Sequence, residues 1–258
     1  MSDPISTIDA AVGEINRLFG TGLPRLGDLG PQSVLARLWG LSAVVQADPP
    51  APILFKACAT NAGFPLAGNL TGQFIIFVTS GEDAPLTPCA TSSAARPSPA
   101  RAPVVALDTS TKSVRFGIIL DINGTSVAVV SGDISSEGLK TGAELTMQDP
   151  IVLGSIDKFE IWVGDNFGVH LPMAKDLPQP LDTVIGKITG MTVTVESAHI
   201  KLPGESSADG VGYTLETTGT FDSPIPLIPG ALGVESIVFG FSNEAADSSG
   251  GEPESLTP

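Results

Sequence analysis

The residues best suited to acid–base chemistry lie close together between positions 161 and 170. This segment holds an indole at Trp162, a carboxylate at Asp165 and an imidazole at His170. In the mouth of a barrel, such a set could transfer a proton beside an aromatic wall. The same residues also fit a polar turn with a solvent-exposed histidine, and this second interpretation is the favoured one.

The other reactive side chains do not form a motif for nucleophilic or metal chemistry. The sequence has 2 Cys and 2 His, but no C-x-x-C pair, no H-x-x-x-H pair and no G-x-S-x-G nucleophile elbow. No glycine-rich phosphate loop follows a strand and opens a helix. We therefore expect no metal site and no cofactor, and the sequence favours a protein that is not an enzyme.

The two cysteines, Cys58 and Cys89, flank a hairpin-like stretch, and the sequence leaves open whether they pair. Two free thiols are favoured, because nothing else in the sequence indicates an oxidising compartment. Cys58 alternates with apolar neighbours as a strand residue does, so we interpret it as a small side chain of the core.

Charge excludes several classes of partner. The 258-residue chain has 13 Lys+Arg against 28 Asp+Glu, which gives a formal net charge of -15. A surface this negative repels phosphate backbones and anionic lipids, so we expect no nucleic acid partner. No apolar run approaches the roughly 18 residues of a membrane-spanning helix, so we expect no membrane span. The charge helps to keep an apolar chain soluble, and it would attract either cations or a basic partner.

The start of the sequence differs from a secretory signal peptide. Asp3 lies near its beginning, and no uninterrupted apolar segment follows. We therefore expect a cytoplasmic protein, with leaderless export as the alternative.

Two short helices are expected before the first strand. Apolar residues between Ile8 and Phe19 recur at three- and four-residue spacing, and Gly20 is placed as a C-cap. A second helix is expected from Pro31 to just before Gly40. Residues 1–40 would then form a lid on the β-structure or a docking segment for a larger assembly.

From Leu41 the apolar period changes to two, which indicates strands, and residues 41–80 form a first hairpin unit. Its strand at 74–78 is apolar on both faces, so it belongs between two covering layers or in a subunit interface. The core interpretation is favoured. If the strand lies in an interface instead, its five residues are the candidate contact residues: Phe74, Ile75, Ile76, Phe77 and Val78.

Three further units follow. Residues 81–103 are rich in Pro, Ser and Ala and are expected to form a linker or loop. Residues 104–242 are expected to form the main antiparallel β domain. Residues 243–258 are expected to be an acidic, disordered tail.

Local patterns fix parts of the main β domain. Asn123-Gly124 suits a two-residue hairpin turn, which would pair Ile122 with Thr125 and Leu120 with Val127. In the segment 191–202 the apolar phase slips once, which predicts a β-bulge at Glu196-Ser197. Alternating apolar residues at 159, 161 and 163 predict another strand.

The sequence therefore predicts an all-β protein, an antiparallel sandwich or barrel with two short N-terminal helices packed on it. The favoured function is a non-catalytic binding or assembly module, a homo-oligomer or a subunit that joins a protein partner in a larger particle. The alternative is a β-barrel enzyme or carrier that acts on a small apolar molecule in an internal cavity, with Trp162, Asp165 and His170 as its site.

Overall fold

The computed structural model describes residues 5–30, 33–46, 49–59, 64–67, 70–80, 85–89, 112–134, 140–168, 191–204, 210–228 and 231–243. Most of the proposed linker 81–103, the tail after residue 243 and His170 lie outside these ranges. The described residues contain two helices, α1 (Ile8–Phe19) and α3 (Ile156–Phe167), together with 3-10 turns at Leu26–Asp28 and Leu35–Arg37. The strands are β1 (Ala43–Val45), β2 (Ile53–Ala59), β3 (Phe64–Ala67), β4 (Leu70–Thr79), β5 (Ser113–Ile122), β6 (Thr125–Ser131), β7 (Gly142–Met147), β8 (Ile151–Ser155), β9 (Thr192–Pro203), β10 (Gly212–Ile228) and β11 (Leu232–Ser242).

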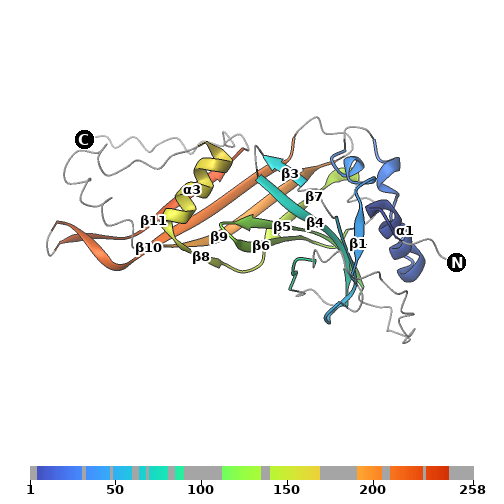
Figure 1. Ribbon diagram of the computed structural model, residues 1–258, viewed down its shortest axis with the longest axis horizontal. Coiled ribbons are helices and arrows are strands. Elements are labelled where there is room, and N and C mark those ends of the chain that lie inside the picture. Colours follow the sequence, from blue (N-terminus) through green and yellow to red (C-terminus); the bar gives the residue numbers. More distant parts are fainter. Residues whose placement is uncertain are drawn as a thin grey trace, which may run out of the picture.

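All of these strands belong to one antiparallel sheet, which confirms the predicted all-β class (Figure 1). The strand order is β1-β2-β4-β5-β6-β7-β9-β10-β11, with β3 beside β4 and β8 beside β9. Strand β4 pairs with β5, so the units proposed at 41–80 and 104–242 share this sheet. The molecule is elongated, with α1 near one end and the β10–β11 hairpin projecting at the other.

The Asn-Gly hairpin has the predicted register. Ile122 pairs with Thr125, and Leu120 pairs with Val127. Asn123 and Gly124 both have positive φ, 57° and 78°, as a two-residue turn that follows the strand twist requires. The alternating side chains of β5 from residue 114 to residue 122 all enter the main hydrophobic core.

The predicted β-bulge in β9 is also present. Glu216 of β10 pairs with Ser197, whereas Thr217 pairs with Val195, so Glu196 is the extra residue. The bulge keeps the apolar side chains on both sides of it in the core, and Val193, Val195, Ala198, Ile200 and Leu202 are all buried.

Strand β4 has core on both faces. Phe74, Ile76 and Val78 belong to a cluster that also includes the buried face of α1. Ile75 and Phe77 belong to a second cluster with Cys58, Cys89 and Leu86. The side chains at 74–78 are therefore fully buried within the chain, as the core interpretation expected.

The prediction for the N-terminal region is correct for one helix only. Helix α1 begins after Thr7, whose hydroxyl accepts a hydrogen bond from the Ala10 amide at 3.1 Å, and Gly20 closes it in the left-handed conformation. The second predicted helix is wrong, because residues 33–40 contain only the 3-10 turn Leu35–Arg37. Its apolar run is too short to offset the cost of nucleating an α-helix.

The strand predicted around residue 161 is also wrong, because residues 156–167 form helix α3. Phe159 and Trp162 lie on its buried face, whereas the Ile161 side chain is 66% exposed. Asp157 in the first turn and Gly168 as a left-handed C-cap are ordinary helix signals. Within the described residues, neither helix is long and apolar enough to cross a membrane.

Candidate functional site

Two residues of the proton-transfer set predicted from the sequence, Trp162 and Asp165, lie in the described part of the chain, both on helix α3. Trp162 lies on the buried face of α3, and its indole N–H donates a hydrogen bond to the Asp121 carbonyl at 3.2 Å. Asp165 lies on the exposed side of the same helix, and His170 lies outside the described residues. Trp162 therefore anchors α3 to the end of β5 and does not face an open site with Asp165.

Aromatic rings fill the space between α3 and the β10–β11 hairpin. Phe159 contacts Phe239 at 6.4 Å and Phe241 at 6.1 Å between ring centroids. Phe167 stacks on Phe241 at 5.1 Å and contacts Tyr213 at 5.7 Å. Burial raises the pKa of the Tyr213 phenol. These contacts fix α3 to one face of the hairpin.

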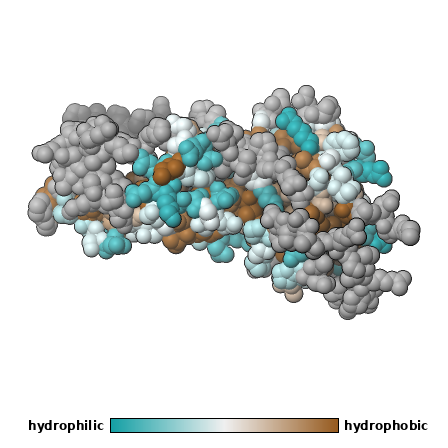
Figure 2. Space-filling model, viewed as in Figure 1, coloured by the Kyte–Doolittle hydropathy of each residue, from teal (hydrophilic) through white to brown (hydrophobic). Residues whose placement is uncertain are grey.

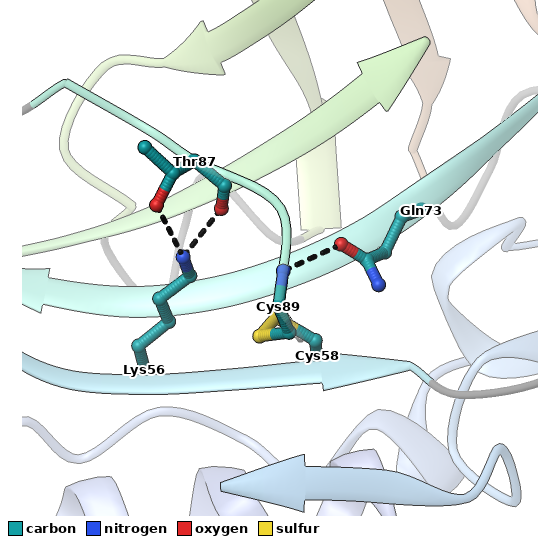
Figure 3. Close-up of a disulfide and its surroundings, with 5 residues drawn as sticks. All are labelled: Lys56, Cys58, Gln73, Thr87 and Cys89. Atoms are coloured by element: carbon teal, nitrogen blue, oxygen red, sulfur yellow. Dashed lines mark hydrogen bonds between the residues drawn. A yellow bond between two sulfur atoms is a disulfide. The ribbon is translucent and has the colours of Figure 1, made fainter. Parts of the chain in front are cut away.

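A second unusual group lies at the other end of the sheet, where residues 85–89 cross the outer face of β2 and β4. We call these five residues the strap. Cys89 forms a disulfide with Cys58, with 6.2 Å between the two Cα atoms, so the expectation of two free thiols is wrong (Figure 3). The Gln73 side-chain oxygen accepts a hydrogen bond from the Cys89 amide at 3.0 Å.

Lys56 lies under the strap with its side chain fully buried. Its ammonium group donates hydrogen bonds to the backbone carbonyl of Thr87 and, at 3.3 Å, to the Thr87 hydroxyl. Among the described residues no carboxylate forms an ion pair with Lys56, and burial lowers the pKa of the amine. Both described hydrogen bonds of its ammonium group go to the strap, so we assign the Lys56 side chain a structural role.

Metal binding has no support from the described part of the chain. In those residues, no three His, Cys, Asp or Glu side chains gather closely enough to hold a metal ion. The described histidine, His199, lies on β9 with its ring 3.8 Å from a Glu144 carboxylate oxygen.

The strongest candidate for a functional site is the free edge of β11. In the described sheet β11 is a terminal strand, and its pairing partner is β10. Figure 2 shows apolar and hydrophilic residues interspersed over this end of the molecule. Val238 is 60% exposed and Leu232 is 54% exposed, so apolar side chains border the edge.

The backbone groups that face the free edge can be assigned from one hydrogen bond. The Asn243 amide donates to the Tyr213 carbonyl on β10 at 3.3 Å. Because successive residues of a strand point their backbone groups to opposite sides, those of residues 241, 239 and 237 also face β10. The intervening residues direct their N–H and C=O groups away from β10: Ser236, Val238 and Gly240.

Sequence reasoning missed this edge, although it placed residues 104–242 in the main antiparallel β domain. The missing information is strand order, which depends on long-range pairing and has no local pattern. Comparison with known protein families, curated protein sequences and solved structures finds no match to this chain.

Proposed function

We propose that this chain is a non-catalytic assembly module that joins another polypeptide by strand addition to the free edge of β11. In strand addition, backbone hydrogen bonds provide affinity and alternating side chains provide specificity. The edge residues that we identified supply three successive sets of such groups over 236–240. The sheet would stay open in this assembly and gain a strand beside β11.

The observation that carries this proposal is the length and chemistry of the edge strand. Strand β11 has 11 residues, and Glu235 is its only charged residue. Exposed edges are usually blunted by short strands, by lysine or proline, or by a covering loop. Strand β11 lacks lysine and proline, so its described edge is open to pairing with another strand.

The opposite edge of the sheet, formed by β1, differs from the β11 edge. Strand β1 has only 3 residues, and the segment before α1 covers it. The Ala43 amide donates to the Ser6 carbonyl at 3.0 Å, and Thr7 forms a bridge with Ser42. One edge is thus short and covered, whereas the other is long and has no partner strand among the described residues.

Proline at Val238 tests the proposal. Val238→Pro removes an N–H group that faces the free edge, and it leaves the hydrogen bonds to β10 in place. Val238→Ala removes the side chain but keeps the N–H group, so it is the matched control. We expect assembly of the wild type in analytical ultracentrifugation, alone or with a partner strand, to be lost in V238P and retained in V238A.

Circular dichroism and a two-state unfolding curve should show that V238P remains folded. If V238P associates as well as the wild type, β11 is not the assembly edge. A wild type that stays at 26.4 kDa and takes up no strand would exclude the proposed function.

A further inference from the structure

We propose that the strand accepted by β11 is an extended, basic segment of another protein, with Lys or Arg side chains on the face that carries Glu216. This inference rests on the proposed function and names its partner class.

The charge distribution of the chain changes at Lys201. All Lys and Arg residues of the chain lie at or before position 201. After it, every charged residue is acidic: Glu205, Asp209, Glu216, Asp222, Glu235, Glu244, Asp247, Glu252 and Glu254. The β10–β11 hairpin thus belongs to a wholly acidic part of the sequence, which attracts a cationic partner and repels another acidic one.

The described acidic side chains of the hairpin are exposed on its two strands. Glu235 belongs to β11 itself, whereas Glu216 and Asp222 belong to β10, and all three are exposed. Glu235 would lie in the strand directly beside an added strand, and Glu216 and Asp222 would lie one strand further in. Since no basic residue follows Lys201, the described hairpin has no cation of its own to neutralise them.

Gly240 opens a direct route from Glu216 to the edge. The two residues are cross-strand partners, so Glu216 lies beside a position that has no side chain. A Cβ atom added at Gly240 would meet nothing within 4 Å, so packing within the chain does not require glycine there. The absent side chain leaves room for a long cation on the next strand to reach the Glu216 carboxylate.

Helix α3 leaves this face of the hairpin free. Its aromatic residues pack on Tyr213, Phe239 and Phe241, which alternate with Glu216 and Gly240 along their strands. The face with Glu216 is therefore opposite the face that α3 covers. A basic partner would meet the Glu216 carboxylate on this open face and backbone groups along the edge.

A second copy of the chain fits these observations less well. Pairing β11 with itself would bring two acidic hairpins together, within a dimer of two chains that each have a net charge of -15. Such a dimer would be stabilised by salt, because screening weakens repulsion, whereas a complex with a basic strand would be weakened by it.

The test uses two fluorescent peptides of eight residues, one alternating Lys with Val and one alternating Gln with Val. Fluorescence anisotropy measures their binding to the full chain at about 50 mM and about 300 mM NaCl. We expect the Lys–Val peptide to bind more tightly than the Gln–Val peptide, and to lose affinity about tenfold or more at the higher salt concentration.

Three variants separate edge pairing from charge recognition. V238P should abolish binding of both peptides. Glu216→Gln should weaken the Lys–Val peptide several-fold and leave the Gln–Val peptide unchanged, and Gly240→Val should do the same by blocking the route to Glu216. Asp157→Asn on α3 removes the same charge from an exposed position on the covered face, so it is the matched control.

The outcomes distinguish the two proposals. Equal binding of both peptides, unaffected by E216Q, would overturn the basic partner and leave strand addition intact. Dimers of the chain that strengthen with salt and disappear in V238P would make a second copy the occupant, which also overturns it. If neither peptide binds and the chain does not associate, both proposals fail.

Discussion

Lys56 and Thr87 join the sheet to the strap that crosses it. The Lys56 ammonium group donates to the backbone carbonyl of Thr87 and to its hydroxyl, and the Cys58–Cys89 disulfide lies beside this contact. A charged amine in a fully buried side chain is costly unless its hydrogen bonds are made. The strap therefore provides acceptors for Lys56, while Lys56 and the disulfide hold the strap.

Lys56→Met should remove a pH dependence of stability. Burial lowers the pKa of Lys56 below its ordinary value of 10.5, so between the two pKa values the unfolded chain binds more protons than the folded chain. The free energy of unfolding of the wild type should therefore rise with pH in this interval. K56M has no group to titrate and should lack this rise.

Urea unfolding between about pH 8 and about pH 10 checks this prediction, with Lys201→Met on the exposed face of β9 as the control. The range ends near pH 10 because burial raises the pKa of Tyr213 in the folded chain above its ordinary value of 10.0. At higher pH the phenol would ionise in the unfolded chain first, and the free energy of unfolding would fall. Parallel pH curves for the wild type and K56M would contradict the prediction.

Reduction of the disulfide should destabilise the chain without changing its fold class. Cys58 and Cys89 are 31 residues apart, and a cross-link over such a loop contributes about 3–4 kcal/mol by restricting the unfolded chain. We expect dithiothreitol to lower the urea midpoint of the wild type by a corresponding amount. The double variant C58A/C89A should have this lower midpoint already and should not respond to dithiothreitol; a response would indicate another cause.

Gly117→Ala should destabilise the strap face through one steric contact. A Cβ atom at Gly117 would overlap Leu86 Cδ2, and both residues lie where the strap packs on β5. Overpacking of this kind costs about 1–3 kcal/mol. In a double-mutant cycle, G117A should cost much less in a Leu86→Ala background, because the clashing atom is gone. Strict additivity of the two changes would contradict this packing.

The sequence predicted those parts of the fold that depend on neighbouring residues. Asn123-Gly124 fixes its hairpin because few dipeptides tolerate positive φ at both turn positions. The bulge at Glu196 was visible because one extra residue reverses the phase of every apolar side chain after it. Both features can be identified within about a dozen residues.

Helix α3 was missed because its apolar residues fit two periods. Phe159, Ile161 and Val163 alternate as in a strand, but Phe159 and Trp162 also share one helical face. The aromatic residues of β10 and β11 favour the helical face, and they lie far away in the sequence. The disulfide and the free edge were missed for the same reason, because both depend on how distant segments meet.

Trp162→Phe distinguishes the anchoring role of this residue from a catalytic or carrier role. The Trp162 indole N–H donates to the Asp121 carbonyl, and phenylalanine would leave that carbonyl without this donor. We expect a loss of about 1 kcal/mol in the free energy of unfolding, measured by circular dichroism because the substitution removes a fluorophore. Trp39→Phe is the control, since the Trp39 side chain is 55% exposed and its loss should cost less than about 0.5 kcal/mol.

The same two variants can be titrated with an apolar fluorescent probe. An anchoring Trp162 predicts that any probe binding is the same in W162F and W39F once the difference in stability is taken into account. Full stability of W162F together with loss of stoichiometric probe binding would contradict the anchoring role. That result would restore the internal-cavity alternative, because a buried indole that contributes nothing to folding would then be serving a ligand.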